Sequence, residues 1–142
     1  VLVVSESAKE KIKSLDDLKK DDVTLTLCET SAPVGMYAEN GLKSLGLWES
    51  VEDSVVSRPS TVNQAAIMVL QDEVDAALIF SSVATANGLT PVDVMSEEDT
   101  GEIIFAAVTV KGGNTAIAEE FAAFAKENVE EFEKYGWKAY EE

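Results

Sequence analysis

The 142-residue sequence contains no histidine and only one cysteine, Cys28. It therefore has no imidazole base, no imidazole metal ligand and no side chain whose ordinary pKa lies near neutral pH. A single cysteine can form neither an intrachain disulfide nor a thiolate cluster for zinc. Because Cys28 follows a strand-like apolar run, we interpret it as a small core residue.

Positive charge is also scarce. The chain has 11 lysines and arginines against 27 aspartates and glutamates, which gives a formal net charge of -16. This charge argues against nucleic acid or an anionic membrane surface as a partner. It also gives no long-range attraction for a small anion, so local amide and hydroxyl donors would have to bind one. No uncharged apolar run approaches the length of a membrane span.

The usual catalytic motifs are missing. The sequence has no Gly-x-Ser-x-Gly elbow, no phosphate-loop lysine motif and no glycine-rich dinucleotide fingerprint. Its many acids are scattered over stretches that we expect to be solvated, which a polar surface explains better than an acid/base pair does. We therefore predict a binding protein rather than an enzyme, with no catalytic residue, no metal site and no cofactor.

The apolar pattern predicts an α/β fold in a chain one domain long. Expected strands are residues 1–4, 23–27, 55–56, 76–80, 92–95 and 103–110. Expected helices begin near residues 15, 33, 62 and 81, a final helix covers about 114–135, and residues 96–102 form a surface loop. Strands and helices alternate along most of the chain, so we expect a mainly parallel sheet flanked by helices.

The final helix carries an apolar stripe at helical spacing. We interpret the stripe as a surface that faces a core. It consists of Ile117, Phe121, Phe124, Ala125, Val129 and Phe132.

One strand-to-helix turn stands out. Residues 30–38 lie between the strand-like run 23–27 and a helical run that stops at Gly46. Pro33 suits the first helical turn because its φ is fixed and its missing N–H would have had no partner there. Gly35 leaves no side chain over that turn. The result is a helix start with free backbone N–H groups, an arrangement that binds anions.

Two further turns repeat this arrangement. Thr61 followed three residues later by Gln64 is a capping-box pattern, so Thr61 is the expected N-cap and Val62 the first helical residue. Ser81 opens a short helical stretch after the strand that ends at Phe80. In a parallel sheet all three turns would lie at the carboxyl edge, where open α/β sheets bind ligands. Ordinary helix starts in any α/β protein would produce the same pattern.

Six motifs in this order resemble the second half of the molybdate-binding proteins of bacterial ABC importers, which are type II periplasmic binding proteins. The motifs are Ser14–Leu18, Pro33–Ala38, Leu45–Trp48, Thr61–Ala65, Asp75–Ser82 and Glu133–Trp137. The resemblance implies a two-lobed fold with an oxyanion in the cleft. Residues 1–142 would be a single three-layer lobe whose first-lobe partner is missing. Its hinge-crossing strands would be about 1–5 and 103–111, its core 14–99, and its C-terminal helix about 114–135.

The resemblance also implies ligand contacts. The backbone N–H groups of Val34, between Pro33 and Gly35, and of Val62, after the cap Thr61, would bind the anion. The family uses a tyrosine hydroxyl at the end of the next strand, where this chain has Phe80. Either a neighbouring hydroxyl such as Ser81 replaces that donor, or affinity and selectivity differ from the family norm.

The resemblance implies the solute-binding component of a molybdate or tungstate importer, with an ABC permease as its partner. Such a protein would be extracytoplasmic, in the periplasm or as a lipoprotein at the cell surface. Sulfate or a small carboxylate remains an alternative ligand, and an effector-binding domain of a transcription regulator remains an alternative class. The abrupt start on the strand-like Val1–Val4, without a signal sequence, suggests a truncated segment, which we expect to self-associate.

Overall fold

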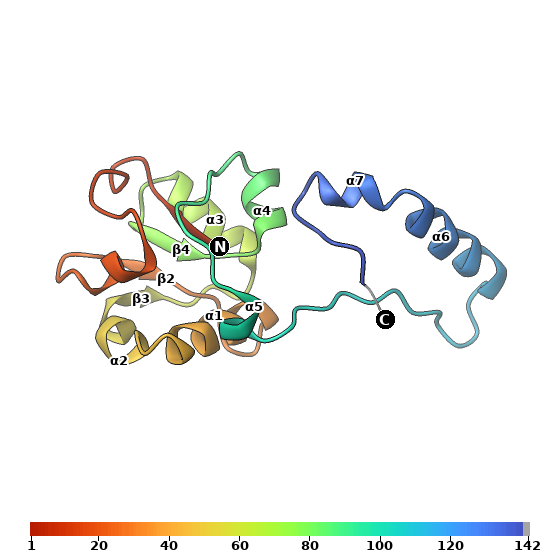
Figure 1. Cartoon of the computed structure of the whole chain (residues 1–142), viewed down its shortest axis with the longest axis horizontal. Helices are drawn as coiled ribbons and strands as arrows, with labels where there is room; N and C mark the ends of the chain where they lie inside the picture. The colour runs from red at the N-terminus through yellow and green to blue at the C-terminus, as the bar shows by residue number, and fades with distance from the viewer. Residues whose placement is uncertain (141–142) are drawn as a thin grey trace. The chain divides into compact units, whose positions relative to one another are not determined.

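The computed structural model describes residues 1–140 (Figure 1). The strands are β1 (Leu2–Val4), β2 (Leu25–Thr26), β3 (Val55–Ser57) and β4 (Ala76–Leu78). The α-helices are α1 (Pro33–Ser44), α2 (Trp48–Val51), α3 (Val62–Leu70), α4 (Ser81–Ala86), α5 (Glu97–Thr100), α6 (Thr115–Glu127) and α7 (Val129–Glu133). Two 3₁₀ helices, η1 (Leu15–Lys19) and η2 (Glu52–Ser54), complete the regular structure of these residues. None of the helices described is long and apolar enough to cross a membrane.

The chain divides into two compact units, Val1–Glu102 and Ile103–Glu142, and residues 141–142 of the second lie outside the described part. The boundary falls at the start of the run for which the sequence predicts a second hinge strand. We refer to these parts as unit 1 and unit 2.

Unit 1 is built on a four-stranded sheet of order β1-β4-β2-β3. β2 pairs in parallel with both β3 and β4, and β1 pairs antiparallel with β4. The predicted α/β class with a mainly parallel sheet is therefore confirmed. Strands are shorter than the sequence pattern suggests, since β4 ends at Leu78 rather than Phe80.

Alternation along the strands sends side chains to both faces of this sheet. In β1, Leu2 and Val4 join one apolar cluster and Val3 joins the other. The first cluster includes Leu18 of η1 and Leu42 of α1. The second includes residues of α3 and α4, which lie together above β4 in Figure 1. Helices therefore cover both faces, which gives the expected three-layer arrangement.

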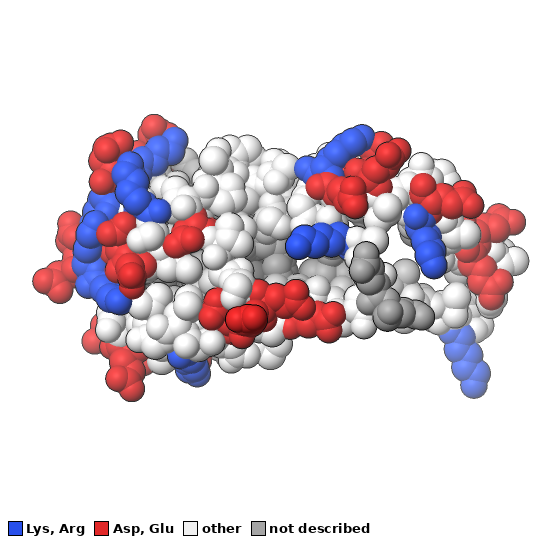
Figure 2. Space-filling view, in the orientation of Figure 1, with Lys and Arg blue, Asp and Glu red and all other residues white. Residues whose placement is uncertain are grey.

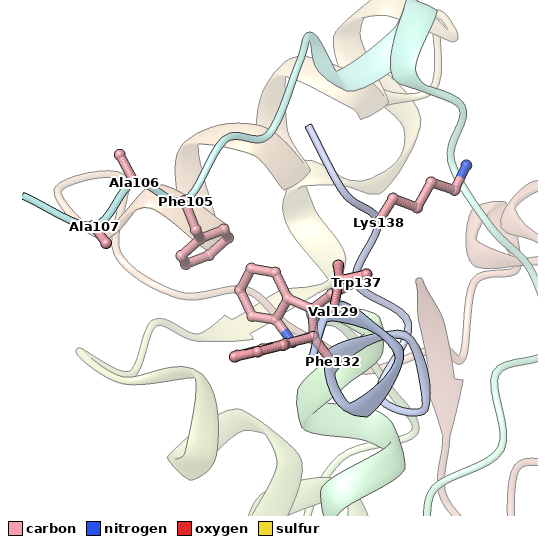
Figure 3. Close-up of a pocket in the computed structure, with 7 residues that line it drawn as sticks. All are labelled: Phe105, Ala106, Ala107, Val129, Phe132, Trp137 and Lys138. Atoms are coloured by element: carbon pink, nitrogen blue, oxygen red, sulfur yellow. The ribbon is translucent and has the colours of Figure 1, made fainter. Parts of the chain in front are cut away.

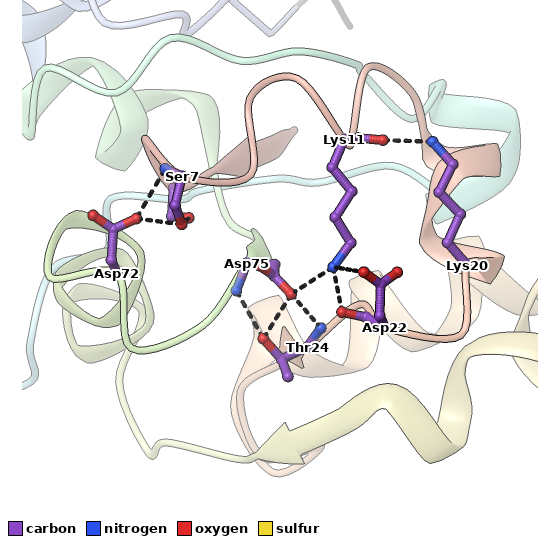
Figure 4. Close-up of polar contacts among 8 residues, drawn as sticks. Ser7, Lys11, Lys20, Asp22, Thr24, Asp72 and Asp75 are labelled. Carbon is purple, nitrogen blue, oxygen red and sulfur yellow. Dashed lines mark hydrogen bonds and ion pairs between the residues drawn. The ribbon is translucent and has the colours of Figure 1, made fainter.

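A polar network ties β2 to the start of β4 (Figure 4). The Asp75 carboxylate accepts hydrogen bonds from the Thr24 amide at 2.7 Å and the Thr24 hydroxyl at 3.0 Å. In return, the Asp75 amide donates to the Thr24 hydroxyl at 2.9 Å, and Lys11 pairs with Asp75 at 3.4 Å. Because these bonds join residues 51 positions apart, they fix the register of two neighbouring strands.

Two short segments of unit 1 differ from the sequence prediction. Residues 92–95 form only an isolated bridge, from Asp93 to Leu2, instead of a strand. Residues 96–102 were expected as a loop but contain α5, because Ser96 and Asp99 form a capping box. α5 packs on α1, where Gly41 leaves room for the Met95 sulfur.

In unit 2 the expected strand over residues 103–111 is not formed. Residues 103–110 have no regular secondary structure in the described chain, and Phe105, Val108 and Val110 are more than half exposed. A β-strand needs a neighbouring strand to receive its backbone hydrogen bonds. No strand of the described sheet pairs with this apolar run.

The final helix is also different from the prediction. It breaks at Asn128, whose side-chain amide donates to the Phe124 carbonyl at 2.8 Å and competes with the backbone there. The expected core-facing stripe is exposed instead, at 61% for Ile117, 65% for Phe121 and 61% for Phe124. Among residues 103–140 no side chain is buried, so this part of the chain provides no core to cover them.

Unit 2 does contain an aromatic hollow (Figure 3). Phe105 meets Trp137 edge to face, with ring centroids 4.3 Å apart. These rings, with Phe132 and Val129, line an open hollow of about 330 Å³. Lys138 points away from the rings in this view.

Candidate functional site

The candidate site lies where three parallel strands end at one edge of the sheet. β2 leads into α1, β3 into α3 and β4 into α4. Because β2 is parallel to both of its neighbours, the carboxyl ends of all three strands lie on the same side. This is the edge at which open α/β sheets bind ligands.

α1 begins as the sequence predicts, with Pro33 at its first position and Ala32 as N-cap. The amides of Gly35 and Met36 both donate to the Ala32 carbonyl, at 3.0 and 3.1 Å. Within the described residues the Val34 amide has no hydrogen-bond acceptor. The Val34 side chain is buried in the second apolar cluster, so only the backbone of this residue could contact a ligand.

Gly35 has a structural function that the sequence pattern did not reveal. A Cβ on this residue would come within 3.0 Å of the carbonyl oxygens of Cys28 and Glu29, closer than real Cβ atoms approach backbone. The first turn of α1 therefore rests directly on the chain that leaves β2. Only glycine permits this approach, which fixes the direction of the helix start.

α3 begins with the capping box that the sequence predicts. The Gln64 amide donates to the Thr61 hydroxyl at 3.3 Å, and the Thr61 amide donates to the Gln64 side-chain oxygen at 3.2 Å. Thr61 is the N-cap and Val62 the first helical residue, as expected. Among the described residues the Val62 amide has no acceptor, so α3 also presents an unpartnered donor.

α4 begins at Ser81 with Phe80 as N-cap. The Phe80 carbonyl accepts hydrogen bonds from the amides of Val83 and Ala84, at 3.1 and 3.0 Å. The Phe80 ring meets the ring of Tyr37 from α1, with centroids 6.5 Å apart and planes at 62°. The structure therefore brings the starts of α1 and α4 into contact.

Tyr37 is the residue of this site that the sequence analysis did not single out. It lies four positions after Pro33, one helical turn along α1, and its side chain is half-buried. The spacing places it on the same face as Pro33. That spacing is a weak signal in sequence, since aromatic residues at helical spacing are usually packing residues.

The basic side chains of unit 1 are all engaged with carboxylates. The pairs are Lys9–Glu6, Lys11–Asp22, Lys11–Asp75, Lys13–Glu10, Lys19–Asp16, Lys20–Asp17, Lys43–Glu39 and Arg58–Glu39. Many of these pairs fall between residues 6 and 22, and Figure 2 shows both signs of charge intermingled at the left of the view. Among residues 1–102, therefore, every lysine and arginine has an acidic partner.

Arg58 lies beside the chain that leaves β2. Its guanidinium donates to the Cys28 carbonyl at 3.5 Å and pairs with Glu39 at 3.3 Å, 5.7 Å from the ring centroid of Trp48. The hydrogen bond from Lys43, with a smaller contribution from Arg58, lowers the pKa of Glu39. Burial raises the pKa of the Cys28 thiol, which suits a core residue and not a reactive one.

These features describe an α/β lobe with unpartnered backbone N–H groups at two helix starts. No group of three or more histidine, cysteine or acidic side chains in residues 1–140 is placed to hold a metal ion. A model of the bacterial extracellular solute-binding protein family matches residues 1–138, and the chain belongs to this family. The prediction of a binding protein rather than an enzyme is thereby confirmed.

Curated relatives include two proteins named molybdate-binding protein ModA. That of Escherichia coli K12 is 26% identical over 108 residues, which are 74% of this chain and 42% of the relative. That of Haemophilus influenzae Rd is 26% identical over 131 residues, 87% of this chain and 51% of the relative. The chain thus spans about half the length of the curated relatives it matches.

Two solved structures share the fold. The substrate-binding domain of a putative molybdenum ABC transporter from Clostridium difficile has a TM-score of 0.72 at 22% identity, over 99% of this chain and 63% of that one. PEB3 with bound L-phospholactate has a TM-score of 0.70 at 20% identity, over 98% of this chain and 64% of that one. Both support the expected periplasmic-binding-protein-like fold.

Proposed function

We propose that this chain is the second lobe of a solute-binding protein that delivers a tetrahedral oxyanion, molybdate or tungstate, to an ABC permease. The names of the relatives support this choice of ligand. The relatives are about twice as long as the chain they match, which supports a two-lobed protein whose first lobe supplies the other wall of the cleft. Delivery to a permease implies an extracytoplasmic location, in the periplasm or as a lipoprotein at the cell surface.

The observation that carries this proposal is the presence of two unpartnered backbone donors at the carboxyl edge of the sheet. The amides of Val34 and Val62 are unpartnered there within the described residues, while every lysine and arginine of unit 1 is already paired with a carboxylate. A dianion would be bound by backbone N–H groups and the positive ends of α1 and α3, without a lysine or arginine. Its charge would stay partly uncompensated, which favours release to the permease.

Pro33, Gly35 and Thr61 support the proposed site without contributing side-chain charge. Pro33 and Gly35 set the first turn of α1, and Thr61 fixes the start of α3 through its capping box. Phe80 and Ser81 form the third wall. Sulfate, or a small acid of the kind named in the PEB3 structure, is the alternative ligand for the same edge.

Val62→Pro in the full-length protein tests the site. Proline suits the first helical position, and the extended backbone of Thr61, at φ -131° and ψ 146°, tolerates a following proline. The change removes the N–H and should weaken molybdate binding about 10- to 100-fold, the value of a hydrogen bond to a charged group. Isothermal titration calorimetry with molybdate, tungstate and sulfate measures this.

Val62→Ala is the matched control because it shortens the same side chain and keeps the amide. It should bind molybdate nearly as well as the parent. Equal loss in both variants would show that the side chain, and not the N–H, matters. Absence of binding of any tetrahedral anion by the parent protein would refute the proposed function and favour an organic ligand or an effector domain.

A further inference from the structure

We propose that the Tyr37 hydroxyl donates a hydrogen bond to the bound anion and so replaces the donor that Phe80 lacks. The inference rests on the oxyanion-binding function proposed above. It assigns a ligand contact to a residue of α1, whereas the resemblance places a tyrosine at the end of the strand. The Phe80 side chain then contributes packing, and its carbonyl still accepts the first hydrogen bonds of α4.

The contact between the two rings places Tyr37 at the carboxyl edge of the sheet, where the candidate site lies. Tyr37 belongs to α1, which follows β2, and Phe80 is the N-cap of α4, which follows β4. β2 and β4 are parallel neighbours, and the two ring centroids are 6.5 Å apart. The Tyr37 ring therefore extends from the first helix start toward the third.

Helix geometry sends the side chain in the required direction. Side chains of α-helices tilt toward the helix N-terminus, and long ones cover the preceding turn. The turn preceding Tyr37 is the one that contains Pro33 and the unpartnered amide of Val34. A phenol one turn further along α1 thus points back to the same edge as that amide.

The hydroxyl itself is an unused donor. The ring contact with Phe80 would be equally good for phenylalanine, so packing does not account for the oxygen. In the described part of the chain the Tyr37 hydroxyl makes no hydrogen bond, and no buried side-chain oxygen or nitrogen there lacks a partner. The hydroxyl oxygen must therefore be accessible from outside, although the residue is half-buried.

Ser81 is the competing candidate, because its hydroxyl lies directly after Phe80 and also makes no hydrogen bond in the described chain. A serine side chain is short and stays close to the start of α4. The phenol oxygen of Tyr37 lies several bonds farther from its backbone. The same is true of the family tyrosine whose position is occupied by Phe80 in this chain. Tyr37 is therefore the better substitute for a donor that must reach across the site.

The test measures molybdate and tungstate affinity of the full-length protein by isothermal titration calorimetry. Tyr37→Phe should weaken binding about 10- to 100-fold. The swapped variant Tyr37→Phe/Phe80→Tyr has the same composition as the parent and should recover most of the lost affinity. Ser81→Ala, measured alongside, should lose less affinity than Tyr37→Phe, because the short serine side chain stays close to the start of α4.

The outcomes separate this inference from the proposed function. If the parent binds molybdate and Tyr37→Phe binds equally well, the assignment of Tyr37 is wrong and the amide site stands. A large loss in Ser81→Ala with none in Tyr37→Phe would transfer the role to Ser81. Unfolding of Tyr37→Phe, seen by circular dichroism, would make the phenol a structural group and overturn the inference. A parent that binds no oxyanion refutes the proposed function itself.

Discussion

Gly35 shows how one residue can position a helix start. The residue is buried, and its Cα faces the carbonyl groups of Cys28 and Glu29 at the end of the strand-like run. Other glycines of the chain are needed for a different reason: Gly88, for example, has a φ of 69° and open space around it. A methyl group added at Gly35 would clash with backbone atoms, whereas one added at Gly88 would meet open space.

Gly35→Ala should therefore destabilise unit 1 by about 3 kcal/mol or more, because backbone must shift to admit the methyl group. Gly88→Ala, the control, should lower the free energy of unfolding by only about 1–2 kcal/mol, the strain of a left-handed backbone in a residue with a side chain. Urea denaturation followed by circular dichroism measures both. Similar losses in the two variants would mean that α1 can move away from the chain below it.

Among the elements, residues 103–110 and α6 differ most from what their sequences predict. The first is an apolar run that pairs with no strand of the described sheet, and the second is an amphipathic helix whose apolar side is exposed. Both lie in unit 2. Apolar surface of this kind is rare on isolated monomers and marks a surface that another part or another molecule covers.

The 142-residue chain in isolation should therefore self-associate, through the apolar side of α6. Replacing Phe121 and Phe124, which are 65% and 61% exposed, by glutamine should shift sedimentation profiles toward the monomer. Ile67→Gln is the control, because Ile67 of α3 is 46% exposed and lies outside unit 2. A strictly monomeric parent chain at about 100 μM would contradict the prediction, since exposed apolar surface drives aggregation in the micromolar range.

For the whole molecule, the negative net charge opposes the binding of an anion at the proposed site. A formal charge of -16 repels a dianion at long range, and screening limits that repulsion to about 8 Å at physiological ionic strength. Binding must then come from donors at short range. On the proposed two-lobed arrangement, this chain holds only part of those donors.

The isolated chain should accordingly bind molybdate weakly. If half of the charge-assisted hydrogen bonds are missing, at about 1.5–3 kcal/mol each, affinity falls by several orders of magnitude relative to the full-length protein. Calorimetry on both proteins under the same conditions makes the comparison. Sub-micromolar affinity of the 142-residue chain would contradict it and would imply a second copy that supplies the missing wall.

Sequence alone was sufficient for the features that depend on local chemistry. The capping box of Thr61 and Gln64 and the proline that opens α1 both follow from interactions within a few residues. The order of strand and helix then implied a parallel sheet, because parallel neighbours require a crossover helix. These local rules led to the correct fold class and to the common edge at which the three helix starts lie.

Only the tertiary structure decided what depends on contacts between distant segments. The meeting of Tyr37 with Phe80 and the ion pairs Lys11–Asp75 and Arg58–Glu39 join residues that are far apart in the sequence. The same reason explains the two wrong predictions in unit 2. An apolar pattern shows that a strand or helix has a face to bury, but a strand forms and a face is buried only where a partner is present.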